Sequence, residues 1–259
     1  MPAQTILKTD NIPSFKHIVL YTGNVMRTGV AGGLHKKAEK ELITAIDDTL
    51  RNSLRANTPS FRYYSEDQLL EVPDLRLGGI APEDRGNIEV TVKLFYLHQN
   101  DSYPASQIID DALRHLQKIL RVSLVDTFIL SSDVERTKAL WPLLEAHQNN
   151  GSVGKLGLTD FTHADLFDFL HDPNVKIKPK INQITVGQCC NMPTELMGLA
   201  KQSGVELLHN GDSADILTTA GFSSLLRSHG VIDKANVSPL WAVKYHVFEN
   251  SRSVVTDKG

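Results

Sequence analysis

The chain has 259 residues and a formal net charge of −3, with 41% hydrophobic and 22% charged residues. This composition is ordinary for a globular protein. The small negative net charge gives no field that would attract phosphate backbones, so nucleic acid is not an expected partner. Residues 1–16 lack the apolar core of a secretory signal, and no apolar run is long enough to span a membrane. The two cysteines, Cys189 and Cys190, are sequence neighbours. We therefore expect a cytoplasmic protein without a disulfide framework.

The N-terminal third predicts one strand, one helix and a long irregular stretch. A strand is predicted over 17–21, followed by a polar turn at Thr22-Gly23-Asn24 and a flexible loop over 29–33. From Lys36 onward, apolar residues recur three and four apart as far as Leu54, which predicts an amphipathic helix. Prolines and glycines interrupt 57–87 without a sustained period. We expect irregular structure there.

The middle of the chain repeats a strand followed by a helix. Alternation over 88–96 predicts a strand whose apolar residues face helices, so that Lys93 points to the opposite side. Ser102-Tyr103-Pro104 is typical of a helix start. The helix that follows has a regular apolar stripe, formed by Ile108, Ile109, Ala112, Leu113, Leu116 and Leu120. A strand over 125–130 and a helix over 137–149 come next.

The second half continues the same alternation. Residues 155–158 form a predicted strand, a helix capped by the segment ending at Thr162 begins near His163, and 181–186 form another strand. A helix over 193–202 ends at Gly204 and leads into a strand over 205–208. Two helices are predicted over 222–227 and 238–248, and a last short strand over 253–256.

Strands that alternate with helices require a mainly parallel sheet. About eight strands in this length favour an α/β fold closed into a single (β/α)8 barrel domain over residues 1–259. No Gly-x-Gly-x-x-Gly follows the first strand. That absence weakens the alternative of an open dinucleotide-binding sheet, because those glycines allow the pyrophosphate to approach the backbone.

Several motifs carry a family resemblance. Gly157-Leu158-Thr159-Asp160-Phe161 and Asn182-Gln183 are similar to the Gly-x-Ser-Asn-Phe and Pro-x-x-Asn-Gln segments of aldo-keto reductase barrels. Four further motifs resemble the regulatory (modifier) subunits of glutamate–cysteine ligase, a catalytically silent offshoot of that superfamily: Leu20-x-Thr22-Gly23-Asn24, Cys189-Cys190-x-Met192-Pro193, Glu206-Leu207-Leu208-x-Asn210 and Pro239-Leu240-Trp241. The resemblance spans nearly the whole chain. It implies an aldo-keto reductase-like barrel with a truncated C-terminal end.

The same resemblance implies that the reductase machinery is incomplete. Reductases of this superfamily use a tyrosine, a lysine, an aspartate and a histidine. Lys93 matches the lysine, with a strand lysine that reaches solvent as the alternative, whereas Ser131 stands at the histidine position and cannot replace an imidazole. We expect Tyr63 and Tyr64 in a surface loop, because their segment lacks both the aspartate and the strand that precede the family tyrosine.

Cofactor and metal binding are not expected. At the family's nicotinamide contacts, Thr159 and Asp160 replace Ser-Asn, Asn210 stands where a stacking tyrosine belongs, and Gln183 alone matches. The ten histidines are scattered without a metal-ligand spacing, and adjacent cysteines lack the two-residue separation that lets a pair clamp zinc.

Two functions remain open, a regulatory subunit and an NADPH-dependent aldo-keto reductase with a reworked active site, and the first is preferred. The resemblance implies a heterodimer with the glutamate–cysteine ligase catalytic subunit, in the first step of glutathione biosynthesis. In it the chain improves glutamate affinity and relieves feedback inhibition by glutathione.

The partner contact is expected in the C-terminal half. Cys189, Cys190 and Met192 cluster soft apolar groups just beyond a strand end, and Trp241 and Tyr245 lie four apart on the helix predicted there. Packing of the two thiols, and of Trp241 against the barrel, is the alternative.

Overall fold

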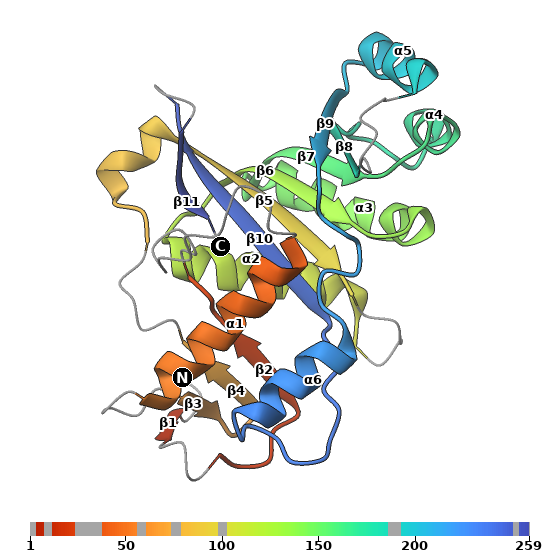
Figure 1. The fold of residues 1–259 in the computed structure, drawn as a ribbon. Coiled ribbons are helices and arrows are strands. Elements are labelled where there is room, and N and C mark those ends of the chain that lie inside the picture. The colour runs from red at the N-terminus through yellow and green to blue at the C-terminus, as the bar shows by residue number, and fades with distance from the viewer. Residues whose placement is uncertain are drawn as a thin grey trace. The chain divides into compact units, whose positions relative to one another are not determined.

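The computed structural model describes residues 4–7, 12–23, 38–55, 61–73, 79–97, 103–185, 193–250 and 254–258. They form an α/β fold (Figure 1). The chain divides into two compact units. The first contains Met1–Gly78 and Leu217–Ser238, and the second contains Gly79–Ile216 and Pro239–Lys258.

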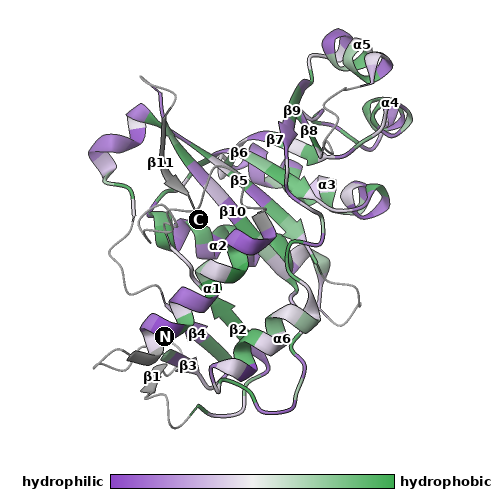
Figure 2. Cartoon of the chain, viewed as in Figure 1, coloured by the Kyte–Doolittle hydropathy of each residue, from purple (hydrophilic) through white to green (hydrophobic). Residues whose placement is uncertain are grey.

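The first unit contains a four-stranded sheet with the strand order β1-β3-β4-β2. Its strands are β1 (Gln4–Leu7), β2 (His17–Leu20), β3 (Phe61–Tyr64) and β4 (Leu69–Val72), and β2 runs parallel to β4. The helices of this unit are α1 (Ala38–Arg55) and α6 (Thr219–Ser228). In Figure 2, β2 and β4 are mostly in the green of hydrophobic residues.

Strand β2 and helix α1 confirm two sequence predictions, whereas the irregular structure expected over 57–87 is wrong at β3 and β4. Phe61 and Leu70 are fully buried, so burial of apolar side chains decided the structure of this stretch despite its prolines. Tyr63 and Tyr64 consequently lie in strand β3 and not in a loop. The loop predicted over 29–33 lies outside the described residues.

The second unit contains a seven-stranded sheet with the order β11-β10-β5-β6-β7-β8-β9. Five strands are parallel and confirm the predicted alternation: β5 (Ile88–Tyr96), β6 (Val125–Ser131), β7 (Val153–Thr159), β8 (Ile181–Thr185) and β9 (Glu206–Asn210). Between them come α2 (Ala105–Leu120), α3 (Val134–Asn149), α4 (His163–His171) and α5 (Thr194–Ser203). The 3-10 helix η3 (Pro82–Asn87) leads into β5.

The core of this unit lies between one face of the sheet and its helices. Every residue of the predicted stripe on α2 is buried, and it packs with Val90, Val92 and Leu94 of β5. Trp141 of α3 is fully buried, meets the ring of Phe169 edge-on at 5.0 Å, and donates its indole N–H to a backbone carbonyl at 2.8 Å. Full burial of a large apolar side chain stabilises a fold by about 1.5–3 kcal/mol. Because these helices cover one face of the sheet, most polar side chains of its strands lie on the other face.

Two helix ends follow the predicted chemistry. The hydroxyl of Thr162 accepts from the backbone N–H of Asp165, whose carboxylate accepts in return from the backbone N–H of Thr162, which forms a capping box at the start of α4. Gly204 ends α5 in the left-handed conformation, with φ 66°.

The helix predicted over 238–248 is wrong, because these residues enter strand β10 (Trp241–Glu249). Tyr245 and Val247 are buried on one face while Lys244 and His246 lie on the other, so the period is two. The cap-like Ser238-Pro239 pair suggested a helix start, but it stands just before the strand.

Strand β10 changes the character of the sheet. It runs antiparallel to β5, and β11 (Val254–Lys258), close to the predicted last strand, runs antiparallel to β10. The sheet is therefore mixed, with β11 and β9 as its outer strands among the described residues. The closed (β/α)8 barrel stays a prediction. Within the described ranges, no helix has both the length and the apolar character needed to cross a membrane.

Candidate functional site

Polar side chains gather where the parallel strands of the second unit end. Because the carboxyl ends of parallel strands meet at one edge of a sheet, residues far apart in the sequence come together there. The structure brings the sequence-predicted positions to this edge and adds further polar residues. The set comprises Lys93, Ser131, Thr159, Asp160, Gln183 and Asn210, together with Thr185, Asp212 and Lys244.

The centre of the site is an ion cluster of Lys93, Asp212 and Lys244. The Nζ atom of Lys93 lies 3.4 Å from Oδ2 of Asp212, and Nζ of Lys244 lies 2.6 Å from Oδ1 of the same carboxylate. Lys93 and Asp212 are both 5% exposed. The Lys93 ammonium also lies 4.7 Å from the ring centroid of Phe95. Lys93 is therefore a buried, paired lysine and does not reach solvent.

Burial and charge act in opposite directions on this cluster. Removal from water lowers the pKa of Lys93 below its ordinary value, because the charged form is disfavoured, and the carboxylate of Asp212 offsets only part of that effect. For Asp212, burial alone would raise the pKa, but the charges and hydrogen bonds of Lys244 and Lys93 outweigh burial and lower it. Asp212 is consequently ionised at neutral pH.

Neighbouring strands hold Asp212 in place. Its backbone N–H donates to Oδ1 of Asn210 at 2.7 Å, and its backbone carbonyl lies 3.0 Å from the hydroxyl of Thr185 at the end of β8. The backbone of Asp212 is thus held by groups from β8 and β9, independently of the bonds that its carboxylate makes to the two lysines. Such prior positioning reduces the entropy that each ion pair must overcome.

Asp160 is exposed, but its carboxylate is bonded within the chain. It follows β7 in the left-handed conformation, with φ 57°, which is uncommon for a residue with a side chain. Its carboxylate oxygens lie 2.6 Å from the backbone nitrogen and 3.1 Å from the hydroxyl of Thr185. These two bonds compensate the unfavourable backbone conformation and tie the ends of β7 and β8 together.

The position of the family histidine is filled by a small polar contact. The hydroxyl of Thr159 donates to the hydroxyl of Ser131 at 3.3 Å, and both residues are buried. Two further atoms, Oε1 of Gln183 and Nδ2 of Asn210, are buried without a hydrogen-bond partner among the described residues. An unsatisfied buried polar group costs about 1–3 kcal/mol. These two amides therefore mark the part of the site that retains polar binding capacity.

Sequence reasoning missed Asp212 and Lys244. Asp212 lies two residues beyond β9, in a segment without a motif, and Lys244 was assigned to the mistaken helix. A period-two reading of 241–249 would have placed Lys244 opposite Lys93 and on the same face of the sheet.

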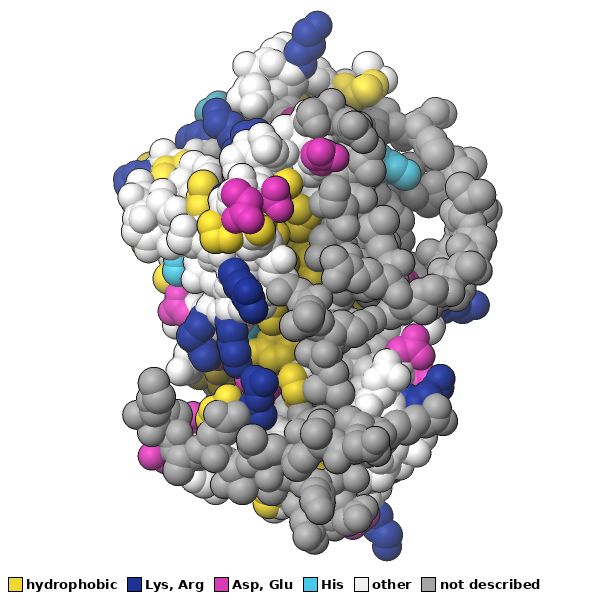
Figure 3. All heavy atoms as spheres, turned by 90° about the vertical axis from the view of Figure 1, so that its left-hand side faces the viewer, with side chains coloured by type: hydrophobic (Ala, Val, Ile, Leu, Met, Phe, Trp, Pro, Cys, Tyr) yellow, Lys and Arg dark blue, Asp and Glu magenta, His cyan; other side chains and the backbone are white. Residues whose placement is uncertain are grey.

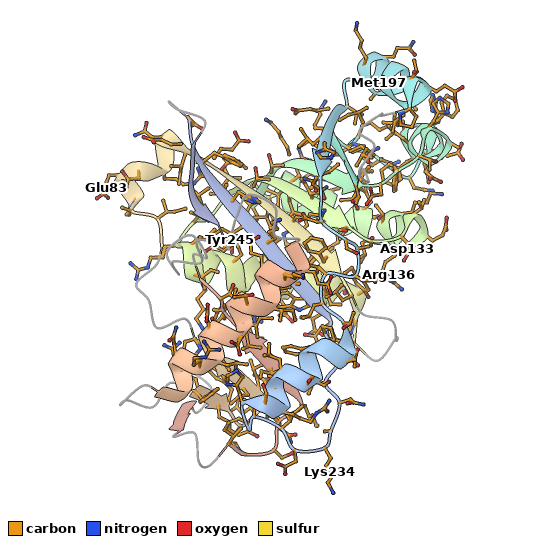
Figure 4. All side chains as sticks on the ribbon, in the orientation of Figure 1. Glu83, Asp133, Arg136, Met197, Lys234 and Tyr245 are labelled. Carbon is orange, nitrogen blue, oxygen red and sulfur yellow. The ribbon has the colours of Figure 1, made fainter. Side chains whose placement is uncertain are left out.

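Only part of the predicted partner contact lies among the described residues. Cys189, Cys190 and Met192 lie outside the described residues. Trp241 and Tyr245 share one face of β10, the strand on which Figure 4 labels Tyr245. Tyr245 is 5% exposed and belongs to the core, while Trp241 is half-buried, with its ring centroid 6.0 Å from that of His115. Across the described part of the chain, no cluster of three or more potential metal ligands is present.

Comparison with known proteins places the motifs in context. No family model matches the chain. It is 26% identical to proteins from Mus musculus and Homo sapiens, each named glutamate–cysteine ligase regulatory subunit, over 93% of this chain and 89% of the relative in each case. The resemblance indicated by the motifs is thereby confirmed.

Solved aldo-keto reductases are similar to a smaller part of the chain. One from Bacillus halodurans has a TM-score of 0.38 and 13% identity, covering 46% of this chain and 41% of its own. An aldose reductase from Giardia lamblia has a TM-score of 0.35 and 19% identity, covering 44% and 42%.

Proposed function

We propose that the chain is a non-catalytic regulatory subunit that binds the glutamate–cysteine ligase catalytic subunit. In the complex it improves the affinity of the catalytic subunit for glutamate and relieves feedback inhibition by glutathione. The observation that carries this proposal is the similarity to named regulatory subunits over nearly the full length of both chains. A cytosolic setting is part of the proposal, since glutathione synthesis needs free thiols and the chain has no cysteine spacing that would indicate a disulfide framework.

The surroundings of Lys93 support the non-catalytic part of the proposal. A reductase lysine acts with an aspartate on a tyrosine hydroxyl, whereas among the described residues the partners of Lys93 are Asp212 and the ring of Phe95, and no tyrosine hydroxyl. Ser131 offers a hydroxyl where a carbonyl-orienting imidazole would be needed, and Thr159 already binds that hydroxyl. The site is therefore built for internal pairing.

The same geometry argues against a nicotinamide cofactor. The carboxylate of Asp160 accepts from the backbone N–H of Thr185 and lies 3.1 Å from its hydroxyl, and the hydroxyl of Thr159 donates to Ser131. Of the three positions that would meet the carboxamide in the family, Gln183 alone has a side-chain atom without a partner. One amide does not make a nicotinamide site, and ATP, magnesium, glutamate and cysteine belong to the partner.

Regulation of this kind has a thermodynamic signature. If the chain raises glutamate affinity by some factor, glutamate must tighten the association of the two subunits by the same factor. Coupling between sites is typically about 1–3 kcal/mol, or roughly 5–150-fold. The subunit and the substrate then stabilise one conformer of the catalytic subunit together.

The test combines purified chain with purified ligase catalytic subunit. We expect a lower apparent KM for glutamate, a higher glutathione concentration at half-inhibition, and tighter association in saturating glutamate. A complex with unchanged kinetics would refute regulation, and failure to form a complex would refute the partnership. Steady NADPH-dependent reduction of carbonyl compounds by the chain alone would instead favour a reductase with a reworked active site.

A further inference from the structure

Three aromatic rings line the exposed side of helix α4. His163, Phe167 and His171 stand four residues apart, so they lie one above another on the helix, and all three are exposed. The ring centroids of His163 and Phe167 are 6.4 Å apart, and those of Phe167 and His171 are 4.1 Å apart. We refer to these three residues as the ring stripe.

The ring stripe contributes little to the core. Helix α4 already buries Leu166 and Phe169, and Phe169 packs edge-on against Trp141 and Phe161. Phe167 is 45% exposed, and Met197 of α5, the helix that contacts α4, is 44% exposed. They are the large hydrophobic side chains classed as exposed within the described ranges. Exposed large apolar side chains on two contacting helices indicate an interaction site.

On the face drawn in Figure 3, hydrophobic side chains are visible between charged and polar ones. Figure 4 places Met197 on α5, and Figure 1 shows α5 beside α4 at one end of the second unit. An aromatic side chain and a methionine on neighbouring helices are the residue types enriched in the buried centres of protein interfaces.

The charge around the ring stripe defines the partner. From Thr162 to Asp172 the chain carries Asp165, Asp168 and Asp172 and has no lysine or arginine, and the ammonium groups of Lys176 and Lys178, beyond the helix, bind the backbone carbonyls of Pro173 and Asp172. An apolar centre with acidic neighbours complements a surface that combines apolar groups with lysine or arginine.

The ring stripe is also partly ordered before binding. Nδ1 of His171 lies 2.7 Å from the backbone carbonyl of Phe167, which fixes the imidazole against the phenyl ring. Binding to such a surface loses little side-chain entropy, so more of the contact energy remains as affinity.

We propose that the ring stripe, together with Met197, is the docking surface for a basic segment of the glutamate–cysteine ligase catalytic subunit. A lysine or arginine of that segment pairs with Asp168, and apolar neighbours cover Phe167 and Met197. This inference rests on the proposed function and goes beyond it by naming the surface and the chemistry of the partner segment.

The test measures the dissociation constant of the purified subunits for the parent chain and three variants. Phe167→Ser and Asp168→Lys should each weaken association at least about tenfold, as expected for residues at the centre of an interface. Glu83→Lys is the matched charge reversal on η3, where Glu83 is exposed, and should leave the constant unchanged. Parent affinity should fall as salt rises from about 0.05 to about 0.5 M, because added ions screen the charge attraction.

The outcomes separate the two proposals. If the parent chain does not bind, the proposed function fails. If the parent binds and Phe167→Ser and Asp168→Lys bind equally well, or if affinity is insensitive to salt, the docking surface is wrong while the function stands. Sedimentation of the chain alone tests a second copy as occupant: self-association that Phe167→Ser abolishes would overturn the ligase segment. Circular dichroism and urea unfolding confirm that each variant is folded.

Discussion

Lys93 and Lys244 lie directly opposite each other on the antiparallel strands β5 and β10, and the carboxylate of Asp212 binds both. Like charges opposite each other in a sheet repel, so the pair is tolerable only with an anion between them. Lys93, which the motif resemblance matches to the reductase lysine, thus belongs to the ion cluster that connects strands of the second unit.

Asp212→Asn should destabilise the chain by about 3 kcal/mol, because it leaves two ammonium groups without their counter-charge. Lys93→Met should cost less than about 1 kcal/mol, since it removes one buried charge and leaves Asp212 paired with Lys244. Urea unfolding of both variants measures the difference. Equal losses would show that the cluster does not act as described.

The contribution of Asp212 to the stability of the folded chain should depend on pH. Its pKa is lowered below the ordinary value of 3.8, so the folded state binds its proton less readily than the unfolded state does. The stabilisation is fully present above that ordinary value and is lost as pH falls through the lower folded-state pKa. The stability gap between the parent and Asp212→Asn should therefore narrow as pH falls from about 5 to about 2. A gap that stays constant over this range would contradict the ionic role.

Trp241→Ala should lower stability by about 2 kcal/mol, a loss smaller than that of a fully buried tryptophan because the side chain is half-buried. Binding to the ligase catalytic subunit should change little in conditions where the variant stays folded. Unchanged unfolding combined with lost binding would instead place Trp241 in the partner contact. Calorimetry and a binding assay on the same preparation distinguish these results.

The isolated chain should not oxidise NADPH in the presence of aldehydes or ketones. Among the described residues no tyrosine hydroxyl is bonded to Lys93, and Ser131 cannot act as the imidazole does. Absorbance at the nicotinamide band, followed with parent chain and with Lys93→Met, checks this. Turnover by the parent that Lys93→Met abolishes would restore Lys93 to a catalytic role.

Two glycine substitutions should act in opposite directions. A Cβ at residue 154 would lie 2.6 Å from the backbone oxygen of Asp126, so Gly154→Ala forces two adjacent strands apart and should cost about 2 kcal/mol. Gly198 lies in α5, and a Cβ there meets nothing within 4 Å. Gly198→Ala should stabilise by about 0.5–1 kcal/mol, because alanine favours the helix. Thermal unfolding of both variants tests the contrast.

Local signals predicted much of the second unit. The buried stripe of α2, the helix cap at Thr162 and the end of α5 at Gly204 depend on residues near in sequence, and they appear as expected. The strand β10 could not be predicted in the same way, because Ser238-Pro239 supplied a helix-start signal that burial of Tyr245 and Val247 overrode.

The candidate site shows the same division. Motif positions such as Thr159 and Gln183 were found because they are contiguous with strands of recognisable sequence. Asp212 was missed because its role arises from residues 119 and 32 positions away, and no local pattern marks such a contact.

The bond between Asp212 and Lys244 also bears on chain connectivity. The two residues stand before and after the segment that departs at Leu217 and returns at Ser238, and they are 32 positions apart in the sequence. Their ion pair joins the two ends of this inserted segment without a covalent link. Because the entropy cost of closing a loop grows only slowly with its length, insertions within the segment should reduce the stability of the second unit only slightly. The sheet of the second unit can therefore keep its strands in register while the inserted segment changes in length or is cut. The exposed residues Asp233 and Lys234, which precede the two residues that Arg227 binds, are a suitable site for new chain termini.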